Sequence, residues 1–182
     1  SRKVLTTSPV SVGIKVLLTG LPKSGKCTML TTLIADVHSK RGMSSPEVRE
    51  NGERIGFDLQ DEHGKTAILS RVGTPTDYPV GRYYVDLVSL ERFIEPLFKY
   101  TPEQLLFIDE IGQMQLYSKR FKSLVRDYLE APNDFIGTIS QVYDHPFTHD
   151  LRQSKDLLLC TVTPENRELL KAAVVEALNH RV

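Results

Sequence analysis

Residues 20–28 have the sequence Gly-Leu-Pro-Lys-Ser-Gly-Lys-Cys-Thr, and this stretch decides the fold expected for the chain. From Gly20 to Lys26 it follows the pattern G-x-x-x-x-G-K-[ST] of a phosphate-binding loop. The next position departs from the pattern, because Cys27 stands where a magnesium-binding hydroxyl is expected. The stretch therefore predicts that the chain binds a nucleoside triphosphate, and it leaves open how well the chain uses the bound metal.

The residues on both sides of this loop predict the strand and the helix that a phosphate loop requires. Residues 12–19 are apolar and β-branched, which is typical of a short buried parallel strand. Residues 27–38 carry apolar side chains at helical spacing. Gly20 and Gly25 let the backbone amides turn toward the phosphates, and the new helix adds its positive end. Lys26 would reach the same phosphate oxygens as a compact cation.

The composition indicates one globular domain without a strong preference for a charged partner. The chain has 182 residues, and 23 Lys plus Arg balance 23 Asp plus Glu. This balance disfavours a dedicated nucleic-acid binder or a binder of acidic membranes. No apolar run approaches membrane-spanning length, and the two cysteines, Cys27 and Cys160, suggest a reducing compartment. We expect a disordered tail over residues 1–12, one domain over residues 13–182, no signal peptide and a cytoplasmic location.

Strands and helices alternate along the rest of the chain. Asn51-Gly52, inside residues 46–59, predicts a β-hairpin, and a turn at 61–64 leads to a strand at 66–69. Residues 71–84 form a long loop with Gly and Pro, which makes them a candidate functional loop. Helices are expected at 89–100, at 118–129 and from Thr163 onward, strands at 104–109, 135–139 and 156–161, and a loop around His145 and His149. The alternation predicts a three-layer α/β domain with a mostly parallel sheet and a hairpin insertion.

A second chemical signal lies at residues 105–112, Leu-Leu-Phe-Ile-Asp-Glu-Ile-Gly. Four apolar residues followed by Asp-Glu form a Walker B pattern, in which a buried strand delivers a carboxylate to the phosphate loop. Asp109 is then placed to hold Mg²⁺ directly or through water. Glu110 is placed to polarise a water for in-line attack on the γ-phosphate. By itself such a run is usually a strand that meets solvent, but together with the phosphate loop it predicts a catalytic site.

Several stretches together carry a family resemblance. They are residues 20–28, Glu47-Val-Arg-Glu with Arg54-Ile-Gly-Phe57, Val80-Gly-Arg-Tyr-Tyr-Val-Asp86, residues 108–112 and Ser118-Lys-Arg-Phe121. In this order they resemble the thermophilic and cancer-related nucleoside-triphosphatase family, and the resemblance covers nearly everything from residue 14 onward. It implies a P-loop nucleoside-triphosphatase fold and slow, Mg²⁺-dependent hydrolysis of ATP and other nucleoside triphosphates of several bases.

The resemblance also implies which residues hold the nucleotide. The phosphate loop would comprise Gly20, Leu21, Pro22, Lys23, Ser24, Gly25, Lys26, Cys27 and Thr28. The residues lining the nucleotide would be Leu105, Leu106, Phe107, Ile108, Asp109, Glu110, Ile111 and Gly112. Asp109 would be the carboxylate beside the metal, and Glu110 would be the base.

The chain departs from the family pattern around this site. The family loop commonly ends Gly-Lys-Thr-Thr, and Gly-Lys-Met-Glu commonly follows Walker B, whereas this chain has Cys27, Gln113 and Gln115. A thiol is a poor ligand for Mg²⁺, which demands oxygen, so the metal position formed by Asp109 and Cys27 is weakened. Thr28 does not substitute simply, since the next helical position points about 100° away. We expect nucleotide binding to survive, and turnover to depend on these departures.

Cys27 has two opposite interpretations. At a helix N-terminus beside Lys23 and Lys26, its pKa would be lowered and the thiol would be reactive. The alternative is an inert replacement for threonine.

Other polar residues are weaker candidates. Arg71, Arg82 and Arg120 are candidates to neutralise charge on the γ-phosphate, with Arg82 preferred because it lies in the 71–84 loop; surface ion pairs are the alternative. Thr138 or Ser140, at a strand end, would hydrogen-bond the attacking water or would be ordinary strand-end groups. A base could stack on Tyr83 or Tyr84, although core packing is the commoner role of a tyrosine.

Three functions remain open from the sequence. The first is Mg²⁺-dependent hydrolysis of a nucleoside triphosphate, with Glu110 as base and Lys26 and Arg82 stabilising charge. The second is a nucleotide or small-molecule kinase, which would need an acceptor site and an arginine-rich lid. The third is a nucleotide-binding module whose catalysis is weakened by Cys27.

Overall fold

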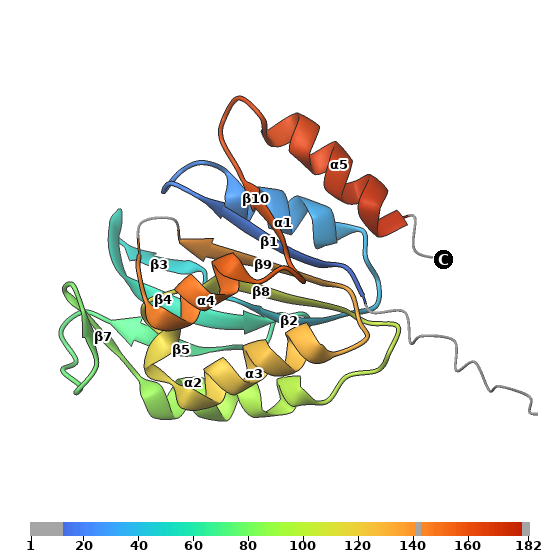
Figure 1. The fold of residues 1–182 in the computed structure, drawn as a ribbon. Coiled ribbons are helices and arrows are strands. Elements are labelled where there is room, and N and C mark those ends of the chain that lie inside the picture. The colour runs from blue at the N-terminus through green and yellow to red at the C-terminus, as the bar shows by residue number, and fades with distance from the viewer. Residues whose placement is uncertain (1–12, 141–142, 180–182) are drawn as a thin grey trace, which may run out of the picture.

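The computed structural model describes residues 13–140 and 143–179, so the tail expected over residues 1–12 lies outside the described residues (Figure 1). Ten strands form one sheet: β1 Lys15–Gly20, β2 Lys40–Ser44, β3 Glu47–Glu50, β4 Glu53–Asp61, β5 Thr66–Arg71, β6 Pro79–Val80, β7 Tyr83–Val85, β8 Leu105–Ile111, β9 Phe135–Ser140 and β10 Leu158–Thr161. Their order is β10-β1-β9-β8-β2-β4-β5-β7-β6, and β3 pairs with β4 beside this path. The strands from β10 to β2 are parallel, and those beyond β2 are antiparallel.

The order of the parallel strands brings both sequence motifs to one edge of the sheet. β9 lies between β1, which precedes the phosphate loop, and β8, which carries Asp109 and Glu110. Gly20 is opposite Ser140, and Ser44 is opposite Asp109. Because parallel strands end on the same side, these positions form one polar rim.

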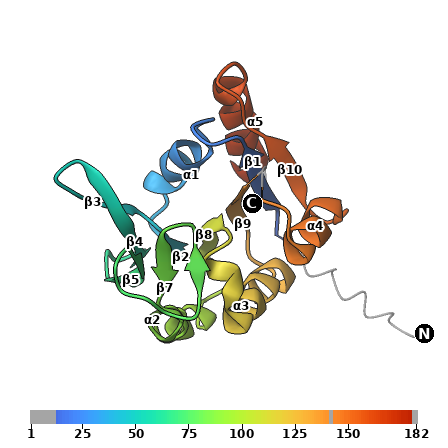
Figure 2. The same ribbon diagram turned by 90° about the vertical axis from the view of Figure 1, so that its left-hand side faces the viewer.

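Helices cover both faces of the sheet, as Figures 1 and 2 show. The helices are α1 Lys26–Ala35, α2 Leu87–Ile94, α3 Lys119–Glu130, α4 Pro146–Gln153 and α5 Arg167–Asn179, with short 3₁₀ turns at Glu95–Phe98 (η1) and Gln115–Tyr117 (η2). α1 and α5 pack on one face with Val16 and Leu18, whereas α2, α3 and α4 pack on the other with Leu17. This alternation follows from the two-residue period of a strand and makes two separate cores. The predicted three-layer α/β fold is confirmed.

The antiparallel part of the sheet is larger than the predicted hairpin. The hairpin of β3 and β4 turns at Asn51 and Gly52, both with positive φ, as the sequence predicts. The long loop predicted over residues 71–84 contains β6 and enters β7, and these strands extend the sheet beyond β5. β2 was not predicted, because its sequence Lys-Arg-Gly-Met-Ser is largely polar. The segment expected to be functional is therefore a second small hairpin at the sheet's end.

The prediction of a loop around His145 and His149 is wrong, because His145 is the N-cap of α4 and His149 lies within this helix. The ring of His145 accepts a hydrogen bond of 3.0 Å from the Phe147 amide, and Thr148 completes a capping box with it. Pro146 occupies the first turn, where its missing amide hydrogen costs nothing. The structural role of His145 is therefore to begin a helix.

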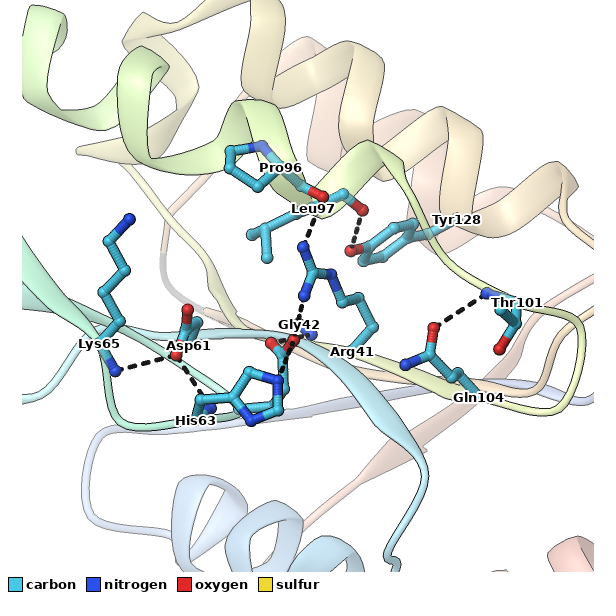
Figure 3. Close-up of polar contacts among 11 residues, drawn as sticks. Arg41, Gly42, Asp61, His63, Lys65, Pro96, Leu97, Thr101, Gln104 and Tyr128 are labelled. Carbon is cyan, nitrogen blue, oxygen red and sulfur yellow. Dashed lines mark hydrogen bonds and ion pairs between the residues drawn. The ribbon is translucent and has the colours of Figure 1, made fainter.

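A buried ion pair fastens the antiparallel strands to the parallel ones (Figure 3). Arg41 on β2 donates to the Glu62 carboxylate at 2.5 Å and to the Pro96 carbonyl at 2.6 Å. The Glu62 side chain is only 3% exposed, and its second oxygen accepts from the Gly42 amide at 3.2 Å. These contacts join β2, the turn after β4 and η1 at the end of the sheet opposite the polar rim.

No helix among the described residues is both long enough and apolar enough to cross a membrane.

Candidate active site

The loop between β1 and α1 has the backbone of an anion cradle. Gly25 has φ 100° and Lys23 has φ 64°, so the chain turns back before α1 begins at Lys26. No side chain caps the start of α1, so the amides of its first turn stay available for a ligand. The buried hydroxyls of Thr19 and Ser24 have no hydrogen-bond partner, which adds unsatisfied polar atoms at the same place. Both features fit a phosphate group.

Lys26 joins the loop to the second motif. Its Nζ donates to the Gly20 carbonyl at 3.2 Å and lies 3.6 Å from Oε2 of Glu110. The Lys26 side chain is 10% exposed and that of Glu110 is 35% exposed. One ammonium group therefore contacts both the phosphate loop and the candidate base.

Asp109 is the centre of a small hydrogen-bonded group. Its Oδ1 accepts from the Thr138 hydroxyl at 2.7 Å and from the Cys27 thiol at 3.1 Å. Thr138, a candidate to position water, therefore contacts Asp109 and orients its carboxylate. Ser140, the alternative candidate, lies on the neighbouring wall of the cavity described below.

Burial shapes the electrostatics of Glu110 and of the Cys27 thiol. Desolvation raises the pKa of Glu110, with Asp109 adding to this and Lys26 opposing it. A raised carboxyl pKa is suited to a general base near neutral pH. Desolvation also raises the pKa of Cys27, and the Asp109 carboxylate, which accepts a hydrogen bond from the thiol, adds to this. The expectation of a lowered pKa for Cys27 is therefore wrong, since Lys26 only partly opposes these causes.

The residues around Asp109 fit a magnesium ion that relies on its substrate for most ligands. Among residues 13–140 and 143–179, no group of three or more His, Cys, Asp or Glu side chains is arranged to hold a metal. Mg²⁺ commonly binds one or two carboxylates together with phosphate oxygens and water, and Asp109 supplies such an oxygen. The sulfur of Cys27, a soft atom beside Asp109, is a poor addition to this set.

The apolar part of the Walker B strand does not reach the site. Leu106 and Ile108 are buried in one core, and Leu105 and Phe107 are buried in the other. Ile111 is also buried in the first core. The expectation that these side chains line the nucleotide is wrong, because packing on both faces of β8 occupies them; Asp109, Glu110 and Gly112 remain at the strand end.

The three arginines considered from the sequence lie in ion pairs away from the loop. Arg82 pairs with Glu53 at 2.8 Å, and Arg71 pairs with Asp58 at 2.6 Å. Arg120 pairs with Glu95 at 2.7 Å and stacks on Phe98. The structure does not bring any of these three guanidinium groups to the phosphate loop.

Arg167, which sequence reasoning missed, lies against the phosphate loop instead. A Cβ atom placed on Gly25 would be 3.3 Å from Nη1 of Arg167. Arg167 is the first residue of α5, and no motif in the sequence marks it. Only the folding of α5 beside α1 reveals this proximity.

A cavity of about 930 Å³ opens beside Asp109 and Glu110. Cys27 and the two acidic residues form one part of its wall, and Arg54 and Tyr83 form another. Residues 20–26 do not line it, so the cavity lies to one side of the phosphate loop. Tyr83, a sequence candidate for stacking, contributes to this wall; Tyr84 does not.

Comparisons with known proteins give consistent matches. A family described as NTPase matches residues 15–175. Nucleoside-triphosphatase THEP1 of Thermotoga sp. (strain RQ2) is 34% identical over 169 residues, covering 91% of this chain and 95% of that protein. The cancer-related nucleoside-triphosphatase of Homo sapiens is 35% identical over 178 residues, covering 88% and 94%. The crystal structure of THEP1 from the hyperthermophile Aquifex aeolicus has a TM-score of 0.81 at 29% identity, covering 91% of this chain and 99% of that chain. The solution structure of the human cancer-related nucleoside triphosphatase has a TM-score of 0.79 at 33% identity, covering 93% and 100%.

Proposed function

This chain belongs to the nucleoside-triphosphatase family, and from that premise we propose that it binds a nucleoside triphosphate on residues 20–28 and hydrolyses it to the diphosphate and phosphate. The observation that carries the proposal is the position of Lys26. Its ammonium group lies 3.2 Å from the Gly20 carbonyl and 3.6 Å from the Glu110 carboxylate. A cation at this position contacts the transferred phosphoryl group and the nucleophile at the same time.

The phosphate loop supplies binding energy and charge stabilisation. The uncapped amides at the start of α1, with Thr19 and Ser24 beside them, bind the phosphate oxygens. Lys26 neutralises charge as it moves onto the leaving oxygen. The backbone makes most of these contacts, so they survive the replacement of the usual hydroxyl by Cys27.

Glu110 acts as the base in this proposal. A water molecule held by its carboxylate attacks the γ-phosphorus, and Glu110 accepts a proton from that water. A new oxygen–phosphorus bond forms while the bond from the γ-phosphorus to the β–γ bridging oxygen breaks. The nucleoside diphosphate then leaves with that oxygen.

We assign the metal to Asp109, whose orientation Thr138 holds through the 2.7 Å hydrogen bond. When bound there, Mg²⁺ would neutralise charge on the phosphate groups. Cys27 lies beside this position but contributes a soft atom that Mg²⁺ disfavours. We also assign to Arg167, in place of Arg82, the additional positive charge beside the loop.

Phosphate release from ATP, GTP and CTP tests the proposal, with Glu110→Gln compared with the wild type. This substitution keeps the size of the side chain and removes the base, so we expect kcat to fall by about 10²–10⁴-fold while the nucleotide Kd changes little. Glu53→Gln is the matched control, because Glu53 is an exposed residue at the start of β4 whose carboxylate pairs with Arg82. Unchanged turnover in Glu110→Gln, or absence of turnover in the wild type with every nucleotide, would overturn the proposal.

A further inference from the structure

We propose that the cavity beside Glu110 binds an uncharged, flat, hydroxyl-bearing molecule of the nucleoside type, and that this molecule accepts the γ-phosphoryl group. The inference rests on the proposed function, because it uses the same triphosphate site. It adds a second substrate and makes the chain a phosphotransferase for which water is the alternative acceptor.

The size and position of the cavity point to an acceptor. Its volume is about 930 Å³, whereas one attacking water occupies about 30 Å³. Cavities of about 300–1,000 Å³ are typical of small-molecule sites. Cys27, Asp109 and Glu110 line this cavity and residues 20–26 do not, so a molecule within it approaches Glu110 without displacing phosphates from the loop.

The wall formed by Arg54, Phe57 and Tyr83 favours a flat ring. The Phe57 and Tyr83 rings meet edge to face with centroids 5.6 Å apart, and the Arg54 guanidinium lies 5.0 Å from one centroid and 5.4 Å from the other. Arg54 is fixed in place by hydrogen bonds of 2.7 Å to the Tyr83 hydroxyl and 3.0 Å to Glu47. All four of these residues line the cavity. A wall held this way is preorganised for a planar ligand.

Uncharged polar groups on other parts of the wall match the edge of a heterocycle. Gln60, Gln113 and Gln115 line the cavity together with Ser45. Gln115 is buried, and its Nε2 donates to the Ser45 hydroxyl at 3.0 Å, which fixes the orientation of both. Amide groups both donate and accept hydrogen bonds, as the edge of a nucleobase requires.

The charge of the wall excludes a phosphorylated acceptor. Among the described residues that line the cavity, Arg54 is the one basic residue, and Glu47 already neutralises it. Glu47, Asp109 and Glu110 therefore outnumber Arg54 on the wall, and Lys26, 3.6 Å from Glu110, does not line the cavity. A phosphate on the acceptor would therefore lack a partner and would be repelled, so the acceptor is a nucleoside rather than a nucleotide.

The transfer step balances without another reactant. The acceptor hydroxyl oxygen attacks the γ-phosphorus and forms a new phosphorus–oxygen bond. The bond between the γ-phosphorus and the β–γ bridging oxygen breaks, and the nucleoside diphosphate leaves. Glu110 takes the hydroxyl proton, just as it would take a proton from water.

The test uses the full chain, Mg²⁺ and ATP labelled at the γ-phosphate, with adenosine, guanosine, cytidine, uridine and thymidine as separate acceptors. We expect label to appear on at least one nucleoside, and the same nucleoside to bind the chain saturated with a non-hydrolysable ATP analogue. The matching 5′-monophosphates should accept at least about tenfold less label, as expected for a phosphate without a partner. Equal or better labelling of the monophosphates would overturn the inference.

Label found only as free phosphate, with no nucleoside bound, would overturn this inference and leave the proposed hydrolysis standing. Absence of both products would contradict the proposed function itself.

A cavity-filling variant locates the acceptor. Val80 lines the cavity, so Val80→Trp should raise the KM for the nucleoside by about tenfold or more and lower the ratio of nucleoside phosphate to free phosphate. Val88→Trp, at a residue that is 68% exposed on α2 and does not line the cavity, should leave this ratio unchanged.

Gln113→Lys is a second variant, on the exposed rim of the wall, and should improve labelling of the monophosphate. An unaltered preference for nucleosides over monophosphates in Gln113→Lys, or equal ratios in the two tryptophan variants, would contradict the assigned position.

Discussion

The thiol of Cys27 lies 3.1 Å from Oδ1 of Asp109, to which it donates a hydrogen bond. The phosphate loop and the Walker B strand therefore meet at this sulfur–oxygen contact. The same oxygen accepts a hydrogen bond of 2.7 Å from Thr138, so the carboxylate is held from two sides. Because this carboxylate is the proposed metal ligand, the residue at position 27 lies where it can change the preference for one metal over another.

Restoring a hydroxyl should therefore favour magnesium. We expect Cys27→Thr to raise kcat/KM with Mg²⁺ by about tenfold, because a hard oxygen replaces a soft sulfur beside Asp109. The gain with Mn²⁺ should be smaller, since Mn²⁺ tolerates sulfur better. Phosphate release measured with each metal checks this. Cys160→Ser, on β10, is the control; an equal Mg²⁺-to-Mn²⁺ ratio in Cys27→Thr and wild type would contradict the assignment.

Lys26 should contribute mainly to the affinity for the triphosphate. Lys26→Ala removes the one ammonium that contacts both Gly20 and Glu110, so we expect the Kd for a non-hydrolysable ATP analogue to rise about tenfold or more. Titration calorimetry gives this value directly. Lys119→Ala, an exposed residue at the start of α3, should leave the affinity unchanged. A Kd equal to that of the wild type would remove Lys26 from the proposed site.

The KM for ATP distinguishes the role of Arg167 from that of Arg82. We expect Arg167→Ala to raise the KM for ATP by about tenfold, the value of one lost charge-assisted contact beside Gly25. Arg82→Ala removes the surface pair with Glu53 and the hydrogen bonds to the Arg54 carbonyl and the Tyr83 hydroxyl, none of which involves the phosphate loop, so the KM for ATP should match that of the wild type. The opposite pattern, with Arg82→Ala impaired and Arg167→Ala normal, would show that the hairpin of β6 and β7 moves onto the phosphate loop during turnover.

Local sequence patterns predicted the parts of the fold that depend on local physics. The alternation of Val16, Leu17 and Leu18 between two cores follows from strand geometry, and Asn51-Gly52 supplies the two positive φ angles of its turn. The motifs at residues 20–28 and 105–112 meet because parallel strands end at one edge of the sheet.

Features that depend on long-range contacts escaped prediction. The polar sequence of β2 does not predict a strand. Arg41 is tolerated there because Glu62 neutralises it, and Glu62 becomes its neighbour only in the folded sheet. Arg167 reaches Gly25 only through the packing of α5 beside α1. The cavity is built from segments as distant in sequence as Arg54 and Gln115, so no local pattern contains it.

Lys23 carries a backbone strain that glycine would relieve. Its φ of 64° places a side chain in the left-handed region, which costs about 1–2 kcal/mol for most residues. Part of this gain is lost because glycine makes the unfolded chain more flexible, so we expect Lys23→Gly to stabilise the fold by about 0.5–1 kcal/mol. Thermal unfolding should show Tm rising by about 2 °C. Lys23→Ala keeps the strain and removes the same charge; equal Tm values for the two variants would contradict this explanation.

The buried pair of Arg41 and Glu62 should be costly to break from one side only. Arg41→Met leaves the Glu62 carboxylate, which is 3% exposed, without its cation, so we expect a loss of about 3–5 kcal/mol in the free energy of unfolding by denaturant. Arg41→Met combined with Glu62→Leu removes both charges and should recover most of this loss. Arg82→Met, which breaks an exposed pair, should cost less than about 1 kcal/mol. If the double variant were as unstable as Arg41→Met alone, the cost would come from lost packing beneath η1 rather than from an unpaired charge.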